Sequence, residues 1–202
     1  TYLSGGADTT SDTVTIDNAS PNGATATGGT AGNTSVTLNW TASNSSSDFD
    51  TTNGSVIYRW ASGSAGSEVP DEGTTPSTGD TDGTATVACV ISSAASAAQT
   101  KIDGTGGDAG CTTSALTNGQ QYTYVAFQRD TNGNYDAGAS IGTFTPIAVS
   151  LTFTIDTPSV SFVSAVTPGT PVSTSSVLTV NTNNSSGYNI TVNRASTTPT
   201  LF

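Results

Sequence analysis

The segment Leu116–Asp130 (LTNGQQYTYVAFQRD) constrains the fold of this chain more than any other part of its sequence. A turn that ends at Gly119 leads into a strand whose side chains alternate between two faces. One face carries Tyr122, Tyr124, Ala126 and Gln128, and the other carries Val125 and Phe127. Such a segment is typical of a central strand in an antiparallel sandwich, entered through a corner where a tyrosine hydroxyl bonds to upstream backbone. It therefore predicts an all-β fold.

The composition is unusually poor in charge. Charged residues make up 9% of the chain and hydrophobic residues 33%, and the formal net charge is -11. Soluble domains usually contain about 25% charged residues, so disorder must be considered. Disordered chains, however, are rich in Glu, Lys and Pro and poor in β-branched residues. Here Thr and Val recur with a period of two, which favours strands with polar Thr and Asn faces.

The charge balance also excludes classes of partner. Lys and Arg total 4, so the chain cannot neutralise a run of phosphates, and neither a nucleic acid nor an anionic membrane surface is expected. No apolar run approaches the roughly 20 residues of a membrane span. The chain has 0 Met and begins at Thr1, so we expect a removed upstream segment, such as a secretion signal, and an extracellular or cell-surface location.

The chain contains 2 cysteines, Cys89 and Cys111, which flank a glycine-rich loop. In a secreted protein such an even pair predicts a disulfide. Closing a loop of about 22 residues would stabilise the fold by roughly 3 kcal/mol. Half of a metal site and a reactive thiol are the alternatives, and both are disfavoured because the chain has no His and no further thiols.

Turn signals divide the first part of the chain into alternating segments. Strands are expected at 12–17, 35–41, 55–61, 84–91, 116–130 and 141–144, with a loop or weak edge strand at 21–32. Residues 1–11 are expected to form a flexible leader or an exchanged strand, and Ser92–Thr100 a helical turn or two. About seven strands over about 130 residues, closed by Pro146, is the count of a Greek-key sandwich.

Four motifs carry a resemblance to a known family. They are Trp40 in SVTLNWT, Tyr58 in VIYRW, the turn and strand LTNGQQYTY, and the turn RDTNGNYD. With these motifs, residues of roughly 10–146 resemble the fibronectin type III superfamily as it occurs in bacterial surface proteins. The resemblance implies a Greek-key β-sandwich over 12–146 and says little about function. The inserted loops at 62–83 and 92–110 and the cysteine pair depart from the family pattern and suggest a specialised subgroup.

Residues 147–202 are expected to form a smaller, incomplete β-sandwich unit. Apolar side chains alternate with polar ones at Val149, Leu151, Phe153 and Ile155, at Val160 and Phe162, at Leu178 and Val180, and at Tyr188, Ile190 and Val192. Four strands with one apolar face each cannot close a sandwich alone. The cover could be chain beyond Phe202, the first domain or another copy of the protein, and an ordinary truncated domain is an equal alternative.

No catalytic constellation stands out. With 0 His, the usual general base and triad member are missing. Lys101 is the only lysine, and its QTKIDG setting favours a solvated side chain. A carboxylate pair for glycoside hydrolysis would have to come from Glu68, Asp71 and Glu72, which lie in one turn-rich loop typical of solvated acids. The sequence thus predicts a protein that is not an enzyme and needs no cofactor, with calcium as the exception considered next.

Calcium is suggested by oxygen-bearing side chains on alternate residues around a glycine turn, at Asp130, Asn132, Asn134 and Asp136. The residues that follow supply no bidentate acid, and the same cluster is good hairpin-turn chemistry. The turn is the favoured interpretation, and calcium stays open. Weaker versions of the signal are Asp48 with Asp50 and Asp80 with Asp82.

Sugars are the other class of ligand considered. Asn-x-Ser/Thr triplets that could accept glycans begin at Asn18, Asn33, Asn44, Asn53 and Asn184, and two more begin at Asn39 and Asn189. Asn39 lies within an expected strand, which makes it a poor acceptor. Trp40, Trp60 and Tyr58 could form a sugar-binding face, although Trp40 alternates with core residues and is expected to be buried.

The leading hypothesis is a non-enzymatic structural subunit of an extracellular surface assembly, such as a filament, stalk or adhesive layer. Copies of the protein would join through β-strand addition and burial of apolar faces. The alternative is a carbohydrate-binding or spacer module of a larger secreted glycan-active protein.

Overall fold

The computed structural model describes residues 17–45, 47–159, 169–170, 173–184 and 186–192. The chain divides into two compact units, unit 1 (Thr1–Ile147) and unit 2 (Ala148–Phe202). The described part of the chain contains strands and no helix, and all its ladders are antiparallel. The all-β fold expected from the sequence is therefore confirmed.

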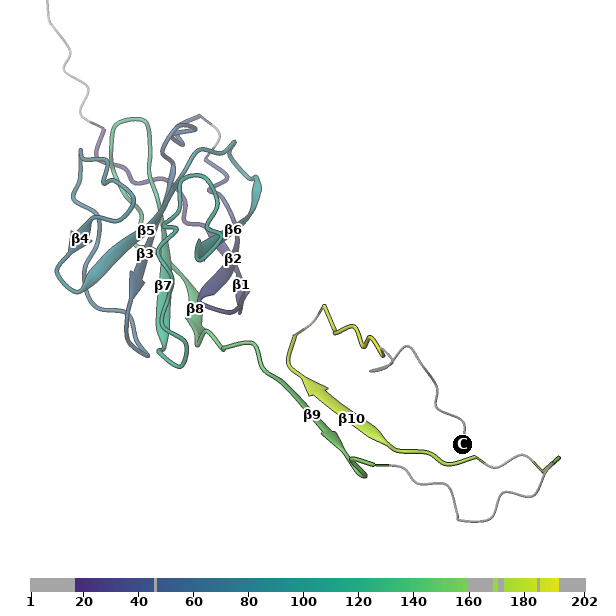
Figure 1. Ribbon diagram of the computed structural model, residues 1–202. Helices are drawn as coiled ribbons and strands as arrows, with labels where there is room; N and C mark the ends of the chain where they lie inside the picture. Colours follow the sequence, from purple (N-terminus) through teal and green to yellow (C-terminus); the bar gives the residue numbers. More distant parts are fainter. Residues whose placement is uncertain (1–16, 46, 160–168, 171–172, 185, 193–202) are drawn as a thin grey trace, which may run out of the picture. The chain divides into compact units, whose positions relative to one another are not determined.

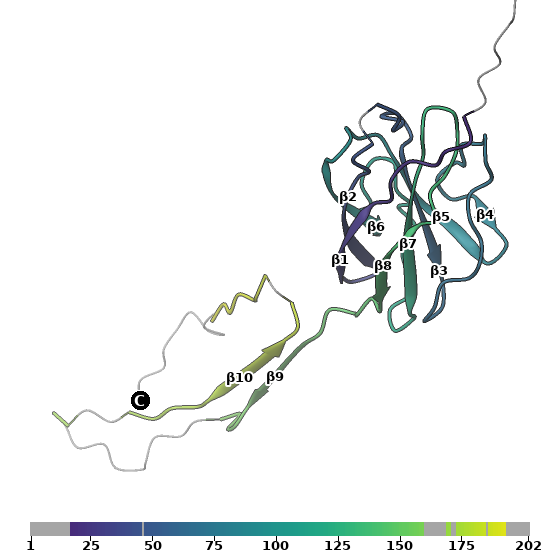
Figure 2. The ribbon, with the colours of Figure 1, turned by 180° about the vertical axis from the view of Figure 1, so that it is seen from behind.

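Unit 1 consists of two sheets that lie as separate layers (Figures 1 and 2). The three-stranded sheet has the order β1 (Thr25–Ala31), β2 (Ser35–Thr41), β6 (Ala98–Gly104). The five-stranded sheet has the order β4 (Thr81–Asp82), β5 (Ala85–Ile91), β3 (Ser55–Trp60), β7 (Tyr122–Gln128), β8 (Ala139–Phe144). The chain changes sheets after β2, β5 and β6, which is the crossing pattern of a Greek-key sandwich.

The main core lies between the two sheets. Strand β2 turns Val36, Leu38 and Trp40 inward, and each is at most 1% exposed. They pack with buried side chains of the facing sheet, among them Ile57 and Tyr124. The alternation in SVTLNWT thus gives β2 one buried face, as a half-covered strand requires.

The five-stranded sheet is also buried on its other face. A second cluster contains Val56, Tyr58, Trp60, Val87, Phe127 and Tyr135. The inserted loop that precedes β4 contributes to the cover, because the Tyr135 hydroxyl donates to Thr74 O (2.9 Å) and Trp60 Nε1 donates to Glu68 Oε2 (2.9 Å). This explains why β3 and β7 are almost continuously buried rather than alternating.

The corner before β7 forms as expected. The hydroxyl of Tyr122 accepts a hydrogen bond from Thr117 N at 3.0 Å. Gly119, with φ of 84°, occupies the left-handed conformation of the turn and donates its N–H to Pro146 O (2.8 Å). The turn thereby fixes both the start of β7 and the end of unit 1.

The strands of unit 1 differ in places from those expected from the sequence. The segment Ser92–Thr100 was expected to be helical, and this is wrong: it bends and then enters β6, which pairs with β2 over seven residues. Pairing with a neighbouring strand overrides the helical preference of its alanines. The weak edge strand expected at 21–32 is β1. Of the strand expected at 12–17 only Asp17 is described, and 1–11 lie outside the described residues.

Unit 2 contains one ladder, in which β9 (Leu151–Ile155) pairs with β10 (Leu178–Thr182). The strand expected at Val160 and Phe162 lies outside the described residues. The expected strand at 188–192 is wrong, since those residues form no ladder. Their alternation is that of a strand, but no described strand lies beside them to accept their backbone hydrogen bonds.

Candidate functional site

The candidate functional site is the apolar face of the β9–β10 ladder, which we call the unit 2 face. The register places Ile155 opposite Leu178, Phe153 opposite Val180 and Leu151 opposite Thr182. Directly opposed residues share a face of the sheet. The other face of the ladder is polar and carries Thr152, Thr154, Thr179 and Asn181. The alternation expected from the sequence therefore produces a two-faced ladder.

The unit 2 face is exposed. Phe153 is 70% exposed and Leu151 58%. The residues around a groove of about 280 Å³ on this face are Leu151, Phe153, Leu178, Val180, Tyr188, Asn189, Ile190 and Thr191. The segment 188–191 thus borders the same hollow as the ladder. Large hydrophobic side chains that lie together on an exposed surface often mark a site of interaction with another molecule.

Both edges of the ladder offer backbone hydrogen-bonding groups. Asp156 N donates to Val177 O (3.0 Å), which makes this pair a hydrogen-bonded one. In an antiparallel ladder hydrogen-bonded and non-hydrogen-bonded pairs alternate, so Leu151, Phe153 and Ile155 direct their N–H and C=O groups outward. Within the described residues, no third strand pairs with either β9 or β10.

Charge is distributed unequally between the units. The charged residues of unit 2 are Asp156 and Arg194, which cancel, so the whole net charge of -11 falls on unit 1. Asp156 closes the end of the ladder: the hydroxyl of Ser176 and the N–H of Val177 both donate to its Oδ1 (2.8 Å each). These hydrogen bonds, led by that of Ser176, lower the pKa of Asp156 to about 2. The unit 2 face itself carries no charged side chain.

In unit 1 the predicted disulfide between Cys89 and Cys111 is confirmed. The two residues face each other as an isolated antiparallel bridge, with Cα atoms 4.0 Å apart. Val90 N donates to Gly110 O and Thr112 N donates to Ala88 O, both at 2.8 Å. The segment 110–112 therefore covers the outer edge of β5 beyond the short strand β4, and the disulfide holds it there.

The residues considered for calcium form a tight turn. Asp130 Oδ1 accepts from the backbone N–H groups of Asn132 (2.9 Å) and Asn134 (2.7 Å). The side-chain amide of Asn132 donates to Asp17 Oδ2 (2.9 Å). Asp136 does not join this group, because its Oδ1 accepts from Gln128 N (2.7 Å). These hydrogen bonds are those of the favoured hairpin turn. Calcium binding by this loop stays a prediction, which a Ca²⁺ titration followed by calorimetry would test.

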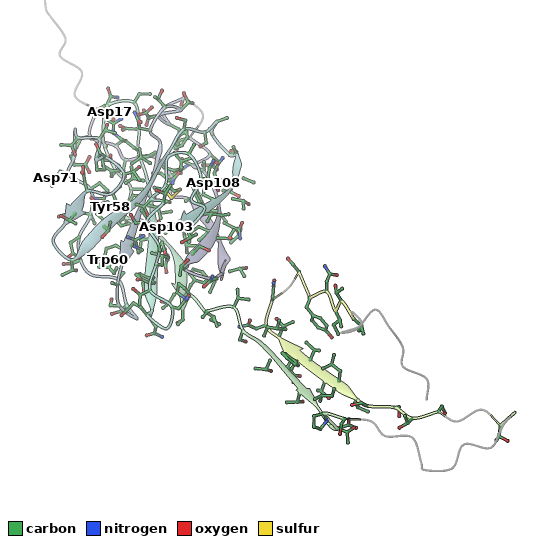
Figure 3. The ribbon with its side chains drawn as sticks, in the orientation of Figure 1. Asp17, Tyr58, Trp60, Asp71, Asp103 and Asp108 are labelled. Atoms are coloured by element: carbon green, nitrogen blue, oxygen red, sulfur yellow. A yellow bond between two sulfur atoms is a disulfide. The ribbon has the colours of Figure 1, made fainter. Side chains whose placement is uncertain are left out.

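An acidic cluster at the same end of unit 1 could not be foreseen. Carboxylate oxygens of Asp17, Asp48 and Asp130 lie within 4.8 Å of one another. Figure 3 shows Asp17 at the end of unit 1 where the described chain begins. Partial burial, followed by the charges of Asp130 and Asp17, raises the pKa of Asp48. The three residues come from separate segments, so no local motif joins them.

The carboxylates considered for glycoside hydrolysis serve as acceptors for the loop itself. Glu68 Oε1 accepts from the hydroxyl (2.6 Å) and the N–H (2.7 Å) of Thr84, and these bonds lower the pKa of Glu68 to about 2. Glu72 Oε2 accepts from Tyr135 N (3.0 Å). Asp71 is exposed in the same loop, and Figure 3 shows it at the periphery of unit 1.

The aromatic face considered for sugars is not exposed. Trp40, Trp60 and Tyr58 are each at most 2% exposed, so a sugar ring cannot stack on them. The glycan acceptors remain predictions: Asn18, Asn33, Asn44 and Asn184 are exposed, and Asn53 is half-buried. Asn39 lies in β2 and accepts a hydrogen bond from the Thr100 hydroxyl (2.8 Å).

A buried ionic network links both sheets and was missed from the sequence. Asp103 of β6 is fully buried and accepts from Arg59 Nη1 (2.6 Å) and from the Tyr124 hydroxyl (2.9 Å). Its other oxygen accepts from the Thr112 hydroxyl. Burial, followed by the charge of Asp103, raises the pKa of Tyr124. In Figure 3 Asp103 lies within unit 1, among the strands. The network satisfies its buried charges and so fixes how the sheets align.

Comparison of the chain with protein-family models, with curated proteins and with solved structures finds no match. Among the described residues, no helix has the length and hydropathy to cross a membrane. The site must therefore be interpreted from its own geometry.

Proposed function

We propose that this protein is a non-enzymatic structural subunit of an extracellular surface assembly, such as a filament, stalk or adhesive layer. Unit 1 would be a rigid module of the fibronectin type III kind, and unit 2 the part that joins copies. The observation behind this role for unit 1 is its two-sheet Greek-key order, in which β3, β7 and β8 are adjacent in one sheet. The disulfide and the absence of a membrane-spanning helix in the described residues are compatible with secretion.

The observation that carries the proposal is the exposure of the unit 2 face. A two-stranded ladder is at best marginally stable in water and needs further strands or a packed layer. Phe153, at 70% exposed, and Leu151, at 58%, are side chains of the ladder that such a layer would cover. The outward backbone groups of β9 and β10 offer strand addition as the second contact.

The test is self-association, measured by sedimentation over a range of protein concentrations. We expect the full chain to form species larger than a monomer, and Phe153→Glu to remove them. Thr154→Glu is the matched control, because it places the same charge one residue along β9 on the polar face. It should associate like the unchanged protein.

A full chain that remains monomeric at every concentration would rule the proposal out. Association that persists unchanged in Phe153→Glu would rule out the unit 2 face as the contact that joins copies. The carbohydrate-binding or spacer module would then be the better hypothesis. Sugar binding would need residues other than the buried aromatic side chains of unit 1.

A further inference from the structure

We infer that the unit 2 face packs against the same face of unit 2 in a second copy, so that two β9–β10 ladders form the two layers of one small sandwich. This inference rests on the proposed function and specifies its partner. Strand addition would join ladders edge to edge through backbone groups. Packing of the faces joins them through side chains such as Phe153 and Val180, and the two contacts can be tested separately.

Charge favours this partner. Unit 1 carries the whole net charge of -11, so unit 1 surfaces of two copies repel each other. The unit 2 face is without charge, and its unit is neutral overall. Two such faces meet without Coulomb repulsion and without burying an unpaired charge. By the same argument, the anionic unit 1 of another copy is a poor cover for an apolar face, since its acidic side chains would lose water at the contact.

The geometry of the face also suits its own copy. The opposed pairs Ile155–Leu178 and Phe153–Val180 form a short apolar surface, and Tyr188 and Ile190 border its groove. Two sheets that pack face to face lie about 10 Å apart and interdigitate their inner side chains. A contact between identical faces is two-fold symmetric, so every contact between a side chain of one copy and the groove of the other occurs twice. Such a contact closes a pair, and longer assemblies would need the ladder edges as well.

The experiment uses opposite charges on the unit 2 face of the full chain. Phe153→Glu and Phe153→Lys should each be monomeric, because like charges would meet at the contact. An equimolar mixture should associate at least about tenfold more tightly than either variant alone, since opposite charges then face each other. Thr154→Glu and Thr154→Lys lie on the polar face, and mixing them should change nothing.

Other results would overturn the inference. If the unchanged chain associates but mixing the Phe153 variants restores nothing, the faces do not meet, and strand addition alone remains as the proposed function. If the unchanged chain is monomeric at every concentration, both proposals fail. Tighter association of the mixed Thr154 variants than of either one alone would place the contact on the polar face and overturn the inference as well.

Discussion

Units 1 and 2 build strands from the same kind of sequence and differ in what covers them. In unit 1 both faces of the five-stranded sheet are buried, and loops protect the outer strands. The segment 110–112 covers β5. Asp108 covers part of β6, donating its N–H to Ile102 O (3.1 Å) and accepting from Ile102 N (2.8 Å). In unit 2, the described ladder has an exposed apolar face and two open edges.

The difference shows that alternation fixes which face of a strand is apolar, whereas the number of layers decides whether that face is buried. Leu38 in β2 and Phe153 in β9 stand in equally regular alternating segments, yet Leu38 is fully buried and Phe153 is 70% exposed. Unit 1 has a second sheet and long loops to supply the missing layer. The described part of unit 2 has neither, so its apolar face is available for a partner.

The largest effect is expected from one substitution made in each unit. Phe127→Ala should lower the free energy of unfolding of unit 1 by about 3–5 kcal/mol, because Phe127 is 2% exposed and packs edge-on against Tyr58. Phe153→Ala should leave unit 1 unchanged and weaken self-association. Both tryptophans, Trp40 and Trp60, lie in unit 1, so urea unfolding followed by tryptophan fluorescence reports that unit alone.

The disulfide offers a second way to sharpen the comparison. Reducing Cys89–Cys111 should destabilise unit 1 by about 3 kcal/mol, since it frees a loop with a sequence separation of 22. The double variant Cys89→Ala/Cys111→Ala should be destabilised similarly and should no longer respond to a reductant. If the unchanged protein has the same unfolding midpoint with and without reductant, the disulfide adds no stability. The hydrogen bonds of segment 110–112 would then be enough to hold it against β5.

Much of unit 1 could be predicted because its strands carry their own signal. The segment 35–41 alternates cleanly and is strand β2 over the same residues. Strand β6 was missed because Ser92–Thr100 contains small residues without apolar alternation, and only pairing with β2 makes it a strand. In unit 2 the apolar face was predictable from alternation alone. Residues 188–192 also alternate, but they form no ladder, because no strand among the described residues lies beside them.

The polar sites divide in the same way. Local sites were predictable. In the turn at Asp130 the side-chain Oδ1 accepts from the N–H of Asn134, only four residues further along the chain. The cysteine pair is recognised from its spacing and from the composition of the chain. Sites assembled from distant segments were not. Arg59 and Asp103 are 44 residues apart in the chain, and Asp17 meets Asp48 and Asp130 only in the folded structure. No spacing in the sequence indicates such contacts.

A third prediction concerns pH and applies to unit 1 alone. Burial raises the pKa of Asp136 to about 6, from 3.8 in the unfolded chain. Between these values the folded state binds a proton that the unfolded state does not, so acidification from pH 7 to pH 5 should stabilise unit 1. The expected gain from this group is on the order of 1–2 kcal/mol. Urea unfolding at the two pH values measures it.

Asp136→Asn is the control for this prediction, because its amide oxygen still accepts from Gln128 N while the titrating group is gone. The gain on acidification should then shrink. The raised pKa of Asp48 acts in the same direction and would account for any gain that remains. If the variant and the unchanged protein respond equally to pH, Asp136 titrates normally and its burial has been compensated by its hydrogen bonds.

The smallest effect again compares one residue type in both units. Tyr122→Phe removes the hydroxyl that accepts from Thr117 N, and we expect a loss of about 1 kcal/mol in the unfolding free energy of unit 1. Tyr188→Phe, at a position that is 48% exposed, should change neither that free energy nor the tryptophan signal. An unfolding midpoint that does not move in Tyr122→Phe would mean that the Asn118–Gly119 turn holds the corner alone. The hydroxyl of Tyr122 would then contribute nothing to the stability of unit 1, and the difference between the units would depend on apolar burial alone.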